Sequence, residues 1–165
     1  MIKIIPCANR NITKKSLAKI WNLFPNDEIC MAELPKEYNK MQWAKVVARY
    51  YILRGKDFSI EIDPLKNMNV VEELIKIGVK KFYFLWSGIR EGLFFSSLDT
   101  ISYSVWIKEN YPDVNINIIY FIDYSNIFSP PNMDLVETSI SFLSNAIKEK
   151  GINGIVRYPH PWYGK

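Results

Sequence analysis

Residues 80–88 read KKFYFLWSG, and this stretch decides the fold. The apolar run from Phe82 to Trp86 has the length of one strand, and an unbroken run of this kind is typical of a buried parallel strand. Ser87 and Gly88 then turn the chain into a helical pattern from about Arg90 to Asn110. A strand, a tight turn and a helix in this order indicate one unit of an alternating α/β protein.

The same alternation runs along the whole chain. Six segments have strand patterns: Ile2–Cys7, Glu28–Glu33, Phe58–Asp63, Lys80–Trp86, Asn117–Ile122 and Ile152–Tyr158. Strictly alternating strands and helices predict an open, mainly parallel six-stranded sheet with helices on both faces, a Rossmann-like arrangement. Six strands are few for a closed barrel, so we expect a doubly wound sheet in a single domain over residues 1–165.

Helix start and stop signals separate these strands. Helices are predicted over 13–24, about 35–53, 67–77, about 90–110 and 134–150. Thr13 is placed to cap the first helix, and either Asn67 or Asn69 the third. Gly55 and Gly78 follow the second and third helices, where glycine commonly ends a helix.

The composition excludes several classes of protein. The chain has 165 residues, of which 48% are hydrophobic, so a disordered chain is excluded. Two cysteines cannot build a disulfide framework, and with one histidine they cannot form the usual four-ligand zinc sites. No segment has the pattern of a signal peptide or the length of an apolar membrane span. We therefore expect a soluble, cytoplasmic protein without a membrane partner.

The net charge of +4 is unevenly distributed. Residues 1–60 contain eleven Lys and Arg against five Asp and Glu, whereas residues 61–165 contain ten against twelve. This asymmetry favours an anionic ligand near the N-terminal half. The alternative is that these charges are solvated faces of the protein. A general nucleic-acid-binding protein would usually be more basic.

In an open parallel sheet, ligands bind beyond the carboxyl ends of the strands, where the strand order reverses. Polar residues follow most of the predicted strands at that edge. They are Asn9, Arg10 and Asn11; Glu61 and Asp63; Ser87, Gly88, Arg90 and Glu91; Asp123, Ser125 and Asn126; and Arg157, Tyr158 and His160. We expect these groups to line one rim of the sheet.

The turn Ser87-Gly88-Ile89-Arg90 predicts an anion site. Glycine lets backbone N–H groups approach a ligand, the following helix N-terminus favours negative charge, and Arg90 can bind phosphate through two hydrogen bonds. Alternatively, Gly88 only serves the turn and Arg90 pairs with a carboxylate such as Glu91. No Walker motif or dinucleotide fingerprint occurs.

Three acidic residues at strand ends, Glu61, Asp63 and Asp123, are candidate ligands of a magnesium ion, although no cofactor is required by the sequence. The alternative is that Asp63 caps the turn before Pro64 and that Glu61 faces a helix. Candidate catalytic groups are Asp123, the hydroxyl of Ser87, and His160, which is the only histidine. His160 lies between two prolines, and a surface or packing role is the alternative.

The chain length and the order of six strands resemble CARF domains, the CRISPR-associated Rossmann-fold ligand sensors. The similarity centres on the fourth strand with its Ser87-Gly88 turn, and the loop Asn9-Arg10-Asn11 would match the other ligand-contacting turn of the family. The spacing at Ser87-Gly88 is shorter than in the commonest family pattern, and no effector domain follows. The resemblance implies a homodimer that senses a cyclic oligoadenylate or cleaves its ring.

Three functions follow from these observations. The first is binding of a nucleotide-like or other phosphorylated anion through Asn9, Arg10, Ser87, Gly88 and Arg90. The second is a metal-dependent phosphoesterase or nuclease that uses the three acidic residues. The third is a non-catalytic interaction subunit, which exposed tryptophans among Trp21, Trp43, Trp106 and Trp162 would support.

Overall fold

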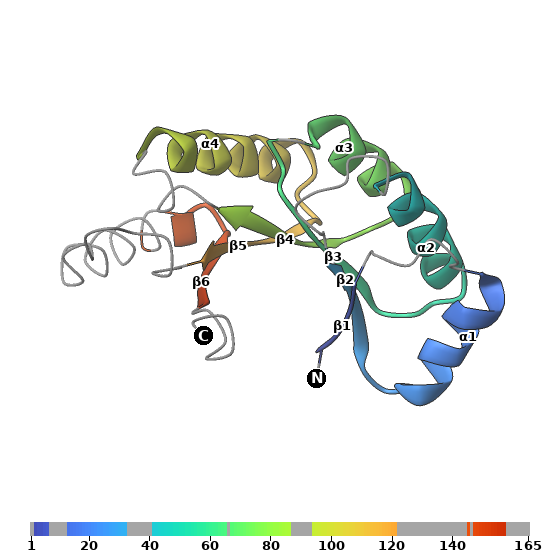
Figure 1. Ribbon diagram of the computed structural model, residues 1–165. Coiled ribbons are helices and arrows are strands. Elements are labelled where there is room, and N and C mark those ends of the chain that lie inside the picture. Colours follow the sequence, from blue (N-terminus) through green and yellow to red (C-terminus); the bar gives the residue numbers. More distant parts are fainter. Residues whose placement is uncertain are drawn as a thin grey trace. The chain divides into compact units, whose positions relative to one another are not determined.

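The computed structural model describes residues 2–6, 13–32, 41–65, 67–86, 94–121, 145 and 147–157. These residues form a parallel α/β protein (Figure 1). They group into two compact units, residues 1–82 and 83–165, and the boundary falls inside one strand. We describe each unit by itself, and the single domain over 1–165 remains a prediction.

The first unit alternates strands with helices, as the sequence predicts. Its elements are β1 (Ile2–Pro6), α1 (Lys14–Leu23), β2 (Glu28–Ala32), α2 (Met41–Leu53), β3 (Phe58–Ile62), α3 (Met68–Ile77) and the start of β4 (Lys81–Trp86). The strands end within one or two residues of their predicted limits. The predicted helix start at residue 35 lies outside the described residues, as does Cys7.

Three helix signals can be compared with the structure. Thr13 caps α1, since its hydroxyl accepts a hydrogen bond from the Ser16 N–H while the Ser16 hydroxyl accepts one from the Thr13 N–H. Gly78 ends α3 with a φ of 118°, a conformation that side chains other than glycine rarely adopt. Asn67 precedes α3, but its side chain donates to the Asp63 carbonyl oxygen instead of capping the helix.

The strand order in the first unit corrects one expectation. β1 pairs with β2 and β2 with β3, all parallel, so the strands lie side by side in chain order without a reversal. α1 packs on α2, and α2 packs on α3 and on β3, so the three helices form one layer (Figure 1). Right-handed crossovers that advance in one direction place every helix on the same face. A doubly wound sheet with helices on both faces is therefore wrong for the described part of this unit, and no switch point occurs in β1–β3.

The helix-facing side of this sheet is apolar. Tyr51 of α2 stacks on Phe58 of β3, with 5.7 Å between the ring centroids, and Ile60 and Ile62 share that face. Tyr51 also donates a hydrogen bond to the Leu17 carbonyl oxygen of α1 at 2.9 Å. Burial raises the pKa of Tyr51 to about 12, and neighbouring Tyr50 adds to the shift. The tyrosine thus connects both helices to the sheet.

The second unit contains the rest of β4, α4 (Phe94–Asn110), β5 (Asn115–Phe121) and β6 (Asn153–Arg157). α4 packs on β5, and β5 pairs with β6 in parallel. Residues 145 and 147–148 are helical, which agrees with a helix before Gly151. The rest of the predicted helix over 134–150 lies outside the described residues.

Within the described part of the chain, none of the helices is long and apolar enough to cross a membrane.

Candidate functional site at the strand ends

The carboxyl ends of the first three strands are level with one another. Pro6, the last residue of β1, pairs with Ala32, the last of β2, and Ala32 pairs with Glu61 near the end of β3. The segments that follow these strands therefore leave the sheet from one edge. Asn9 and Arg10 follow β1 in sequence, but they lie outside the described residues. The strand order does not reverse at this edge among β1, β2 and β3, and the ligand site expected there stays a prediction.

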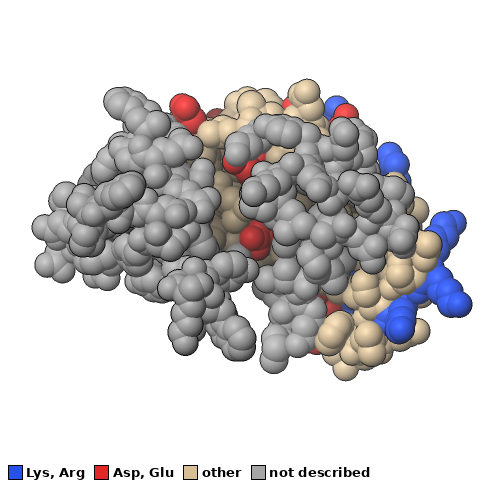
Figure 2. Space-filling view, in the orientation of Figure 1, with Lys and Arg blue, Asp and Glu red and all other residues tan. Residues whose placement is uncertain are grey.

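Two basic residues, Lys14 and Lys15, lie beside this edge at the start of α1. A helix that connects two parallel strands runs back across the sheet, so α1 begins near the carboxyl ends. Lys14 and Lys15 are exposed in its first turn, and that turn contains no acidic residue. Figure 2 shows lysine and arginine side chains gathered on the side of the molecule where α1 lies in Figure 1. The charges of these lysines add to the positive end of the helix dipole, so the start of α1 attracts an anion.

Glu61 and Asp63 differ in their surroundings. Glu61 alternates with the helix-facing Ile60 and Ile62, so it points to the opposite face, where it is 8% exposed. Glu61 therefore does not face α2, the helix that packs on β3. One carboxylate oxygen of Asp63 accepts a hydrogen bond from the Leu65 N–H at 3.1 Å, as expected for a turn cap before Pro64.

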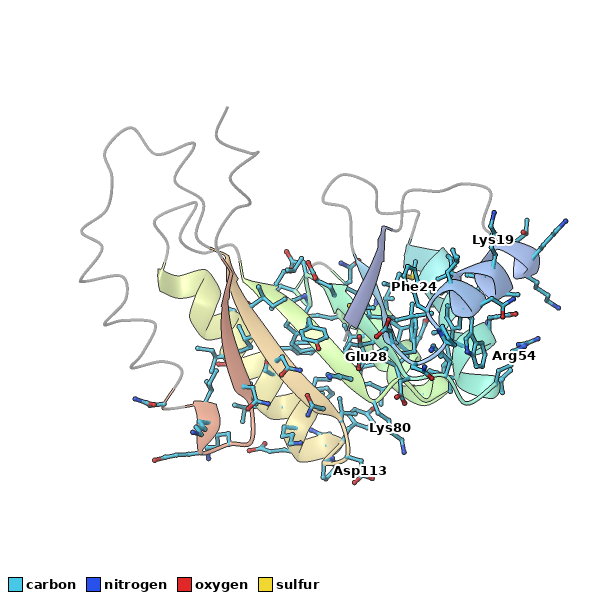
Figure 3. All side chains as sticks on the ribbon, turned by 90° about the horizontal axis from the view of Figure 1, so that it is seen from below. Lys19, Phe24, Glu28, Arg54, Lys80 and Asp113 are labelled. Carbon is cyan, nitrogen blue, oxygen red and sulfur yellow. The ribbon has the colours of Figure 1, made fainter. Side chains whose placement is uncertain are left out.

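The sheet face opposite the helices carries a cluster of five residues from β2, β3 and β4, of which three are buried while Glu28 and Lys81 are partly exposed. We call this cluster the polar face, and its members are Glu28, Cys30, Ser59, Glu61 and Lys81. Glu28 on β2 pairs with Lys81 on β4, with β3 between them, so the ion pair crosses β3. Neighbouring strands are about 4.8 Å apart, and only long side chains can span two such steps. Glu28 lies among the strands in Figure 3, whereas Lys19 and Arg54 extend away from the helices.

Ser59 is the central residue of the polar face. Its partner in register on β2 is Cys30, a buried cysteine, and Glu61 lies two residues further along β3. Ser59 has no exposed surface, and in the part of the chain that the structure describes its hydroxyl oxygen has no hydrogen-bond partner. Most buried hydroxyl groups in folded proteins are hydrogen-bonded, so this group requires an explanation.

Ser59, Glu28 and Lys81 are members of the polar face that were not predicted as site residues from the sequence. A signal was present in the alternation of β3, where Ser59 and Glu61 alternate with Phe58, Ile60 and Ile62. Polar residues at every second position predict one polar sheet face. In β2, whose sequence is EICMA, only Glu28 and Cys30 follow this pattern, because the next alternate position is Ala32.

The second unit has level strand ends as well. Phe121 at the end of β5 pairs with Arg157 at the end of β6. Near the other ends of these strands, Asn153 donates a hydrogen bond to Asn117, which donates one to Asn115. The predicted site residues of this half lie outside the described residues: Ser87, Gly88, Arg90, Asp123 and His160.

Two other predictions concern metals and aromatic residues. Among the described residues, no group of three or more His, Cys, Asp or Glu is placed to hold a metal ion. Asp123 is outside that set, so the magnesium site stays a prediction. Trp106 of α4 is 43% exposed and stacks on Tyr103 at 6.0 Å, so among the described residues the interaction-subunit hypothesis is supported by Trp106.

No protein-family model matches the chain, and neither the curated proteins nor the solved structures include a significant match to it.

Proposed function

We propose that this protein binds a small phosphorylated, nucleotide-like ligand at the carboxyl edge of its parallel strands. The observation that supports the proposal is the level row Pro6–Ala32–Glu61, because the carboxyl ends of β1 to β3 form one edge beside which α1 begins, and Asn9 and Arg10 follow β1 in sequence. In parallel α/β proteins the carboxyl ends of the strands are the usual place for ligands, including proteins whose strands follow one another in chain order.

The charge distribution supports an anionic ligand. Arg10, Lys14 and Lys15 lie within six residues of each other, directly after β1 and at the start of α1. In our proposal Arg10 contributes bidentate hydrogen bonds to a phosphate group, and the two lysines add long-range attraction. Ser87, Gly88 and Arg90 follow β4 in sequence and are proposed as further ligand contacts.

The nucleotide-like part of the proposal also covers cyclic oligoadenylates, which the resemblance to CARF domains implies. In line with that resemblance we propose a homodimer, and we propose one open six-stranded sheet in a cytoplasmic protein. The alternation of strands and helices along the chain supports this sheet.

The binding experiment uses isothermal titration calorimetry with AMP, ATP, cyclic tetra-adenylate and inorganic phosphate. We expect at least one nucleotide to bind, and Arg10→Gln to weaken that binding about tenfold or more, because a charged hydrogen bond to phosphate is lost. Lys80→Gln is the matched control, since Lys80 is exposed directly before β4 and thus at the opposite, amino edge of the strands. The proposal is refuted when the folded protein binds none of these compounds, or when both variants weaken binding equally.

A further inference from the structure

We infer that, for a mononucleotide ligand, the polar face binds the vicinal diol of the ribose, with Ser59 and Glu61 as the hydrogen-bonding residues. This inference rests on the proposed function, and it names the part of the ligand that the first unit recognises. It is carried by the layered order of the polar face and by the Ser59 hydroxyl, which has no partner among the described residues.

The polar face has three layers along the strand direction. At the amino end, the Glu28–Lys81 ion pair crosses β3 at 3.2 Å. Ser59 and Cys30 form the middle layer, paired in register. Glu61 forms the layer nearest the strand ends, about 6.6 Å further along β3 by strand geometry. A ligand that enters from the carboxyl edge therefore meets Glu61 first and Ser59 second.

The Ser59 hydroxyl has no hydrogen-bond partner among the described protein atoms, and we infer that a ligand atom fills this role. A buried hydroxyl without a partner destabilises a folded protein, and alanine at the same position would avoid this cost. Its apolar neighbours Ile60 and Phe58 face the helices, so packing against α2 does not explain the serine. A ligand hydroxyl at this layer would supply the missing hydrogen bond.

The chemistry of the two side chains selects the ligand group. Ser59 both donates and accepts a hydrogen bond, whereas an ionised Glu61 only accepts. A phosphate offers acceptors only and would be repelled by the carboxylates of Glu61 and Glu28. A diol offers two adjacent hydroxyl groups, one of which can donate to Glu61 while the other pairs with Ser59. The polar face therefore suits the sugar, and the basic segment beyond the strands suits the phosphate.

The burial of Ser59 adds a kinetic expectation. Because Ser59 has no exposed surface, the polar face must open at the strand ends before the diol reaches it. Binding that requires a conformational change is slower than the usual rate of about 10⁵–10⁷ M⁻¹s⁻¹. We expect AMP to bind more slowly than inorganic phosphate, which would contact only the outer basic segment.

The test compares AMP, 2′,3′-dideoxy-AMP, ribose 5-phosphate and inorganic phosphate on the wild-type chain and on Ser59→Ala and Glu61→Gln. We expect AMP to bind about tenfold more tightly than the dideoxy compound, and each variant to remove most of that difference. Ribose 5-phosphate shows whether the sugar phosphate alone is sufficient. Ser104→Ala is the control, because it removes a buried hydroxyl of α4 that already donates to the Thr100 carbonyl oxygen.

A second readout separates a ligand contact from a structural role. Without ligand, Ser59→Ala should melt at the same temperature as the wild type or higher, because a buried hydroxyl without a partner is removed, whereas Ser104→Ala should melt lower. Equal affinity for AMP and its dideoxy analogue overturns this inference while leaving the proposed function intact. Failure of every compound to bind overturns the proposed function itself.

Discussion

The carboxylate of Glu28 and the ammonium of Lys81 form an ion pair between two strands that are not neighbours. β3 lies between them, so the pair joins three strands on the polar face. Its side chains are 17% and 36% exposed, which places the pair between a surface and a buried interaction. One oxygen of the Glu28 carboxylate is buried and, among the described residues, has no hydrogen-bond partner.

Lys81→Met should therefore lower the free energy of unfolding by about 1 kcal/mol, since it leaves the Glu28 carboxylate without its cation. Glu28→Gln should cost less, and the double variant should be more stable than the sum of the two single changes predicts. Urea denaturation of all four proteins gives the coupling energy, which should shrink in about 1 M NaCl because salt screens partly exposed charges. Additive effects would show that the two residues do not interact.

Local structure followed from short-range patterns in the sequence. Thr13 and Gly78 mark helix ends because their chemistry acts within one helical turn. The apolar residues of β3 were predictable for the same reason, since alternation along five residues decides which side chains face the helices.

The strand order could not be predicted, because alternation of strands and helices is the same in singly and doubly wound sheets. Only the pairing of β1 with β2 and of β2 with β3 shows that the chain winds in one direction. The polar face depends on this pairing too. Glu28 and Lys81 are far apart in sequence, and nothing local in either segment indicates that they meet.

A second prediction concerns Tyr51, whose hydroxyl donates to the Leu17 carbonyl oxygen of α1. Tyr51→Phe should lower the free energy of unfolding by about 1 kcal/mol at pH 7 through loss of this hydrogen bond. The folded pKa of about 12 lies above the ordinary value of 10.0, so the contribution of Tyr51 is complete below pH 10 and is lost as the pH rises toward 12. The stability difference between wild type and variant should therefore narrow above pH 10. Urea titrations from neutral to alkaline pH measure this difference, and a gap that widens would contradict the assignment.

A third prediction concerns Lys56, whose ammonium group donates to the carbonyl oxygens of Phe24 at 3.0 Å and Pro25 at 2.9 Å. Phe24 is the C-cap of α1, where a positive charge is attracted to the negative end of the helix dipole and stabilises the helix. Lys56→Met keeps the apolar stem and removes the ammonium, so we expect a loss of about 2 kcal/mol. Lys80→Met is the matched control and should change the unfolding midpoint little, because Lys80 is exposed. Equal effects of the two variants would exclude a capping role for Lys56.

The fourth prediction compares two glycines with positive φ. Gly55 has a φ of 74°, and a Cβ atom added there would meet no other atom within 4 Å. At Gly78, with a φ of 118°, an added Cβ would lie 3.2 Å from the Cγ2 atom of Ile52. Gly55→Ala should cost about 1 kcal/mol through backbone strain alone. Gly78→Ala should cost about 2–3 kcal/mol, because its φ is further from the left-handed region that other residues tolerate and the new methyl group crowds α2.

The two causes at Gly78 can be separated through Ile52. If crowding contributes, the cost of Gly78→Ala should be smaller in an Ile52→Ala background, since the contacting methyl group is absent there. The backbone strain is the same in both backgrounds, so the part of the cost that remains measures the conformation of Gly78. Thermal and urea unfolding of the four proteins give both costs. An unchanged cost would assign the whole effect to the backbone, and a cost no larger than that of Gly55→Ala would contradict the prediction.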